Sequence, residues 1–220
     1  SRIMKSSLLP EMILWASGNS EDSYLIPVDP SVVRIMFSGT FDATGGSLTL
    51  SAPDGTVIQQ DDRIEDTPLN CGRVISVDAP ASGTWQVRTA PTGRFWLRVH
   101  AKSGLSLRDA EFVEPDAGPE SDRLVEIQGE PIAGRPATLR VSVSSTFKRP
   151  TFQLVSLDGR PLQAVDLQST DNLEFIGTIT LPIEPFRVLV NGRDESGIPT
   201  QRIWPRLFHG EVVEVVPPAG

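Results

Sequence analysis

Short segments in which apolar and polar residues alternate fill the chain between Gly46 and Lys102, and glycine-containing turns separate them. Alternation with a period of two places every second side chain on the same face of a β-strand. The turns Pro53–Gly55 and Ala81–Gly83 contain glycine, which adopts the positive backbone angles of short hairpins. The region is therefore predicted to form consecutive antiparallel strands of a sheet that is buried on one face only.

The second half of the chain contains a strand series of its own. Short alternating segments recur there at roughly ten-residue spacing, which is typical of an immunoglobulin-like or fibronectin-like β-sandwich. No segment after residue 16 keeps a helical period over three turns, so the predicted fold class is all-β. The strands expected in this half are Leu124–Gln128, Ala137–Val143, Thr151–Leu157, Leu162–Leu167, Phe175–Leu181, Phe186–Val190 and Ile203–Phe208.

Residues 113–122 contain two prolines, a glycine and four acidic residues, which is the composition of a linker. The sequence therefore predicts two tandem β-sandwich domains. The first, residues 1–115, begins with a connector and resembles galactose-binding-like or jelly-roll-like sandwiches. The second, residues 121–220, is the immunoglobulin-like one.

The chain has a formal net charge of -8, which disfavours nucleic acid and anionic membranes as partners. No apolar run is long enough to insert into a membrane, and the amino terminus lacks the apolar core of a signal peptide. If the protein is secreted, we expect its signal upstream. Cys71 is the single cysteine, which excludes an internal disulfide, and we interpret it as an unreactive thiol.

Two tryptophans are expected to have different roles. Trp85 follows a turn at the start of a strand and is predicted to lie in the core. In Phe95–His100 the alternation predicts that Trp96, Arg98 and His100 share the exposed face. These three residues are candidate contacts with a ligand or partner, with inter-domain packing or partial exposure as the alternative.

Asp61, Asp62, Glu65 and Asp66 place four carboxylates within six residues, enough oxygen atoms for a Ca²⁺ ion. Their spacing lacks the regular pattern of a calcium-binding loop, so a solvated acidic loop is the alternative. A catalytic triad, a Gly-x-Ser-x-Gly motif and a phosphate-binding loop are all missing from the sequence. No catalytic residues and no cofactor are therefore predicted.

Several short motifs follow one another along the chain: Leu25–Val32, Ala52–Gly55, Ala79–Val87, Gly93–Leu105, Pro185–Gly197 and Gln201-Arg202. In this shared order, from about Ser7 to Phe208, they resemble the region that follows the von Willebrand factor A domain in hemicentins and related proteins. The resemblance implies an extracellular, matrix-associated or cell-surface protein with an A domain immediately upstream, and a protein partner or that A domain as its contact.

The A-domain metal motif, Asp-x-Ser-x-Ser, is not preserved, because the nearest match, at Asp29 and Ser31, has Val33 at the last ligand position. The leading hypothesis is thus a non-enzymatic module for adhesion or matrix assembly that flanks an A domain. The alternative is a carbohydrate-binding module that binds a glycan through Trp96. A third hypothesis, a glycan or peptide hydrolase, would need Asp61, Asp62 or Glu65 as its acid.

Overall fold

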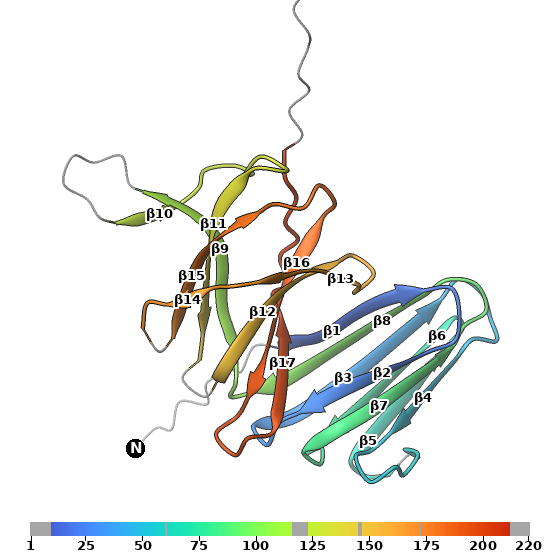
Figure 1. The fold of residues 1–220 in the computed structure, drawn as a ribbon. Coiled ribbons are helices and arrows are strands. Elements are labelled where there is room, and N and C mark those ends of the chain that lie inside the picture. The colour runs from blue at the N-terminus through green and yellow to red at the C-terminus, as the bar shows by residue number, and fades with distance from the viewer. Residues whose placement is uncertain (1–9, 60, 116–122, 145–146, 172, 212–220) are drawn as a thin grey trace, which may run out of the picture.

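The protein is described here by a computed structural model that covers residues 10–59, 61–115, 123–144, 147–171 and 173–211. These residues form seventeen β-strands joined by turns and loops (Figure 1). They contain no helix, and accordingly none that could cross a membrane. The prediction of an all-β fold is confirmed.

The largest sheet is antiparallel, has nine strands and continues from one half of the chain into the other (Figure 1). Strands β1 and β17 join the two halves of this sheet, with Met12 opposite Ile203. In spatial order the strands are β13 (Pro161–Val165), β12 (Lys148–Ser156), β16 (Phe186–Arg193), β17 (Pro199–Ile203), β1 (Pro10–Gly18), β8 (Phe95–Ser103), β3 (Val32–Phe41), β6 (Gly72–Asp78) and β5 (Ile64–Leu69).

Two smaller sheets each pack against one end of the large sheet and enclose a separate apolar core. The first core includes Phe37 and Trp85, and the second includes Phe112 and Phe186. Each end is therefore a β-sandwich. The three-stranded sheet is β2 (Asp22–Val28), β7 (Gly83–Ala90) and β4 (Ser47–Ser51); the five-stranded sheet is β10 (Leu124–Glu126), β9 (Leu107–Pro115), β11 (Pro136–Val143), β15 (Glu174–Thr180) and β14 (Gln168–Ser169).

The strands between Gly46 and Lys102 do not form the single sheet that was expected, because β4 and β7 lie in the three-stranded sheet and β5, β6 and β8 in the large one. Residues 64–69 form β5, where a calcium loop or an acidic loop was expected.

Three further segments also differ from the expected strands. Residues 10–18 form β1 of the large sheet, where a connector was expected. Residues 107–115 form β9 and pair with β10 and β11 of the second half, so the expected linker at 113–122 begins inside a strand. Residues 116–122 lie outside the described part of the chain. The strand expected at 203–208 is displaced, since β17 ends at Ile203.

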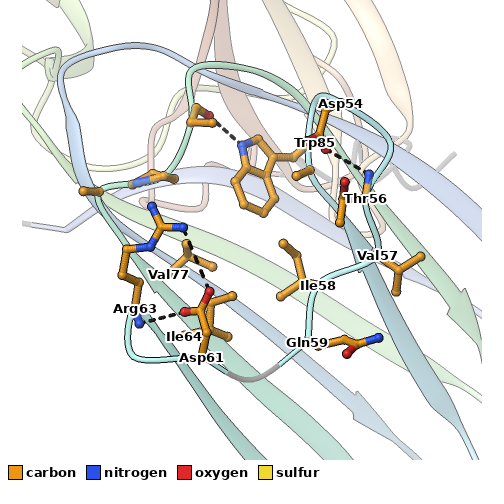
Figure 2. A pocket seen from close by; sticks show the side chains of 14 residues that line it. Asp54, Thr56, Val57, Ile58, Gln59, Asp61, Arg63, Ile64, Val77 and Trp85 are labelled. Carbon is orange, nitrogen blue, oxygen red and sulfur yellow. Dashed lines mark hydrogen bonds and ion pairs between the residues drawn. The ribbon is translucent and has the colours of Figure 1, made fainter.

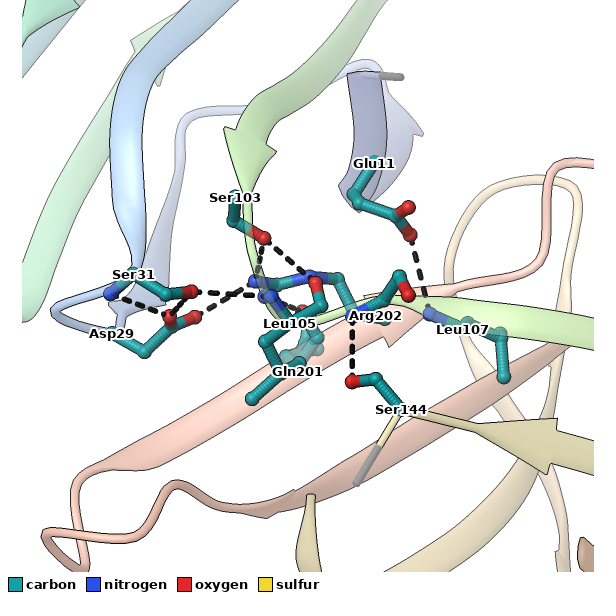
Figure 3. A network of polar contacts seen from close by, with 10 residues as sticks. Glu11, Asp29, Ser31, Ser103, Leu105, Leu107, Ser144, Gln201 and Arg202 are labelled. Atoms are coloured by element: carbon teal, nitrogen blue, oxygen red, sulfur yellow. Dashed lines mark hydrogen bonds and ion pairs between the residues drawn. The ribbon is translucent and has the colours of Figure 1, made fainter. Parts of the chain in front are cut away.

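A buried polar network connects the two halves (Figure 3). Arg202 of β17 is fully buried, and its Nη2 lies 2.8 Å from Oδ2 of Asp29, also fully buried, in the β2–β3 loop. The same guanidinium donates from Nε to the carbonyl oxygen of Leu105 at 3.1 Å and from Nη2 to Oγ of Ser103 at 2.7 Å. Burial of two opposite charges is tolerated when both are hydrogen-bonded, as they are here.

Candidate functional site

Strand β8 presents a polar and aromatic face on the outer side of the large sheet. Phe95, Leu97 and Val99 are buried in the first core. Trp96 and His100 alternate with them and are half-buried, whereas Arg98 is exposed. Alternation in the sequence thus placed the three candidate contact residues on the face opposite to the core.

The ring of Trp15 lies between two arginines. Trp15 on β1 is directly opposite Arg98 on β8, and the Cζ atom of Arg98 is 4.1 Å from the ring centroid. The Cζ atom of Arg187 on β16 is 4.2 Å from the same centroid. Strands β8 and β16 lie on opposite sides of β1 in the sheet, so the two arginines come to this ring from different strands. We call Trp15, Trp96, Arg98, His100 and Arg187 the arginine–tryptophan surface.

This surface carries positive charge that no carboxylate in the described part of the chain neutralises by an ion pair. No ion pair joins Arg98, Arg187 or His100 to any carboxylate of the described residues. Burial lowers the pKa of Arg187, and the nearby charge of Arg98 lowers it further. The Nη1 atom of Arg187 and the Nδ1 atom of His100 are buried without a hydrogen-bond partner in the described structure.

His100 allows a prediction on pH dependence. Burial, and secondly the charge of Arg98, lower the pKa of His100 below its usual 6.5. The unfolded chain therefore binds a proton at this residue before the folded protein does as the pH falls. We expect the free energy of unfolding to decrease as the pH falls below about 6.5, and the His100→Gln variant to show a smaller decrease.

Urea unfolding at pH 7.5 and at steps down to pH 5.5 measures this difference. His209→Gln is the matched control, because His209 is the other histidine and is exposed. Comparing each variant with the wild type at the same pH removes the contribution of the carboxylates. Parallel pH profiles for the wild type and His100→Gln would contradict the assignment.

The four candidate calcium ligands are not brought together. Asp61 accepts a hydrogen bond from the backbone N–H of Arg63 at 2.7 Å. Glu65 pairs with Arg34 on the exposed face, with 2.7 Å between Nη2 and Oε2. The following residue, Asp66, faces the other way and forms two hydrogen bonds with Arg73, which lower its pKa.

Asp62 is exposed and has no hydrogen bond or ion pair with the described residues. No group of three or more potential metal-binding side chains occurs within the described part of the chain.

Trp85 lines a cavity of about 540 Å³ at one end of the first sandwich (Figure 2). Its side chain is 2% exposed, and its Nε1 donates to the carbonyl oxygen of Ala81 at 2.8 Å. Ile58, Ile64 and Val77 add apolar surface to the cavity. The loops before β5 and β7 form this cavity together with residues of the strands beside them. Sequence patterns did not indicate it, because its shape depends on how two separate loops meet.

The fold and the surface together define a class of protein: an all-β sandwich that presents a cationic and aromatic sheet face. No protein-family model matches the chain. It is similar to mouse hemicentin-1, with 23% identity over 194 residues, and to mouse hemicentin-2, with 26% identity over 198 residues; both alignments cover 83% of this chain. Human hemicentin-1 is 21% identical over 192 residues and the same share of the chain.

The chain spans only 3% to 4% of the length of these relatives. The similarity is weak homology and supports a hemicentin-like region. The extracellular location that the resemblance implied agrees with this homology. Among solved structures, the Bacillus licheniformis lipase BlEst2 in its propeptide form aligns with a TM-score of 0.44 and 12% identity, over 94% of this chain and 42% of the lipase chain.

Proposed function

We propose that this chain is a non-enzymatic extracellular module that supports adhesion or matrix assembly beside a von Willebrand factor A domain. The observation that carries the proposal is the arginine–tryptophan surface, which lies on a sheet shared by both halves of the chain. The weak homology to hemicentins supports the extracellular setting. The chain would act as a spacer and as a contact surface.

The contact in this proposal is a protein partner or the neighbouring A domain, bound through Trp96, Arg98 and His100. Tryptophan, arginine and methionine are enriched in protein interfaces, and tryptophan and arginine also in their energetic hot spots. Met36 on β3 lies opposite His100 and is 37% exposed, so it extends the same surface. The composition of this face is thus suited to a protein partner.

The spacer role rests on the way the two halves are joined. We propose that they are two β-sandwich domains that behave as one rigid unit, because a continuous sheet and the buried Asp29–Arg202 pair connect them. A small third cluster of buried residues, Met12, Val155, Leu189 and Ile203, packs against Trp15 at the same junction. A force that a bound partner exerts on this surface would therefore act on both domains.

The test is to delete residues 10–211 from a secreted parent protein that contains the A domain and to measure secretion, incorporation into cell-deposited matrix, and cell adhesion. We expect secretion to persist while incorporation or adhesion decreases several-fold. A flexible Gly/Ser linker in place of the segment serves as the control and should not restore either activity. Full adhesion and assembly in the deletion variant would refute the proposal.

A carbohydrate-binding module is the second candidate, and the half-exposed indole of Trp96 is the observation that favours it. Stacking of a sugar ring would need a free face of that indole. The Cζ atom of Arg94 lies 5.5 Å from the ring centroid of Trp96, so this arginine would contribute to the same site. A glycan array probed with the wild type and with Trp96→Ala tests this candidate: saturable binding that the variant loses would support it, and no binding or equal binding by both would exclude it.

A further inference from the structure

We propose that the arginine–tryptophan surface binds an acidic segment of a protein partner, with a carboxylate of that segment hydrogen-bonded to Arg98 and a second positive charge supplied by Arg187. The proposal rests on the function proposed above, because it takes this surface as the contact, and it adds the chemistry of the partner. Arginine binds carboxylates through two parallel N–H donors, which gives such contacts both strength and direction.

The first argument is the distribution of charge. Acidic residues outnumber lysine and arginine by 28 to 20 in the chain. Some exposed arginines are paired, Arg34 with Glu65 and Asp78 and Arg160 with Asp158 and Glu184, and others such as Arg108 are not. Arg98 and Arg187 are distinctive because both contact the ring of Trp15 and neither pairs with a carboxylate of the described residues.

The second argument is the burial of Arg187. This residue is only 7% exposed, its Nε makes one long hydrogen bond of 3.4 Å to the carbonyl oxygen of Pro205, and its buried Nη1 has no partner in the described structure. A buried cation without a counter-ion is unfavourable. A carboxylate arriving at the exposed neighbour Arg98 would bring a negative charge close to Arg187 and reduce that cost.

An acidic protein segment fits this surface better than a sugar or a long polyanion does. The ring of Trp15 already contacts Arg98 and Arg187 and packs against the buried cluster around Met12, so little of it is left for a sugar ring. On β5 and β6 of the same sheet, Glu65 and Asp78 share the single cation Arg34, which leaves a net negative charge that would repel a polyanion extended across the sheet. A local acidic group with apolar neighbours, which would meet the exposed Met36, fits better.

A phage-displayed peptide library provides the probe. Peptides are selected on the full chain, with counter-selection on the Arg98→Glu variant, and selected peptides are measured by fluorescence anisotropy at low and physiological salt. We expect the selected peptides to contain aspartate or glutamate, and Arg98→Glu to weaken their binding at least tenfold. Replacing the acidic residue of a peptide by lysine should weaken binding to the wild type and restore part of it to Arg98→Glu.

Arg88→Glu is the matched control. Arg88 is exposed on β7 of the three-stranded sheet, and its change alters the net charge by the same amount. We expect less than a twofold effect on peptide affinity from this variant. Equal urea midpoints of the two variants establish that both are folded. Selected peptides without acidic residues, or equal losses in the two variants, would overturn the proposal.

Two further measurements test other ligands that this surface could bind, namely a glycan and a second copy of the chain. Binding of heparin and of neutral glycans is measured with the same variants. Glycan binding that depends on Arg98, without binding of acidic peptides, would overturn the proposal and identify a glycan as the ligand. Sedimentation of the chain at rising concentration tests a second copy, and Arg98-dependent self-association without peptide binding would likewise overturn the proposal. If acidic peptides do not bind while deletion of residues 10–211 still decreases matrix incorporation several-fold, the proposed ligand chemistry is wrong and the proposed function stands.

Discussion

Replacing Arg202 by methionine is expected to lower the free energy of unfolding by about 3–5 kcal/mol, because it leaves the buried carboxylate of Asp29 without its counter-ion. Both side chains are fully buried, and three groups from the first half, Asp29, Ser103 and Leu105, accept hydrogen bonds from the guanidinium. Methionine has a similar length but cannot donate to any of them. Urea unfolding followed by far-UV circular dichroism and tryptophan fluorescence measures the loss.

The control for this prediction is Arg88→Met, which removes an exposed arginine whose Nε lies 3.7 Å from Oε1 of Glu21. Exposed ion pairs contribute about 1 kcal/mol or less, so little change is expected there. A double variant, Asp29→Asn with Arg202→Met, should lose less stability than the sum of the two single variants, because the stranded charge is removed. A loss below about 1 kcal/mol in Arg202→Met would contradict the assigned role of the pair.

The same variant tests whether the two cores unfold together. If the junction couples them, the wild type should unfold in one transition, with the two spectroscopic probes coincident. In Arg202→Met the weakened junction should allow the transitions to separate. If the variant is strongly destabilised and its two spectroscopic transitions still coincide, the shared sheet alone is sufficient to make the two cores unfold together.

Local patterns predicted the strands but not their partners. Alternation identified most strands of both halves. The pairing of β9 with β11 and the contact of β1 with β17 join residues that are distant in the chain. Register between distant strands depends on which faces are buried together, and a single sequence does not contain that information.

The residues of the arginine–tryptophan surface could likewise be predicted only where they lie on one strand. The alternation in β8 was sufficient to orient Trp96, Arg98 and His100 away from the core. Trp15 and Arg187 were missed because one lay in an expected connector and the other in a strand that was assigned only to the second half. No sequence motif links them; the nine-stranded sheet brings β1 between β8 and β16. Asp29 was considered only as a metal ligand, and its ion pair with Arg202 depends on the junction.

The second large effect is expected from Trp85→Ala, which should lower the free energy of unfolding by about 3–5 kcal/mol, the usual cost of removing a large buried aromatic ring. Trp85 is 2% exposed, and its ring lies 6.0 Å from that of Phe37 in the first core. The variant also removes the N–H that donates to Ala81. Chemical denaturation followed by circular dichroism measures the loss.

Trp96→Ala is the matched comparison, since it removes the same side chain from the outer face of β8, where the indole is half-buried. A loss of about 1 kcal/mol or less is expected there, because fewer contacts are broken. Trp85→Phe should fall between the two: the ring is largely retained while the hydrogen bond to Ala81 is lost. Equal losses of stability in Trp85→Ala and Trp96→Ala would mean that Trp96 is as well buried as Trp85. The arginine–tryptophan surface would then not be an exposed contact face.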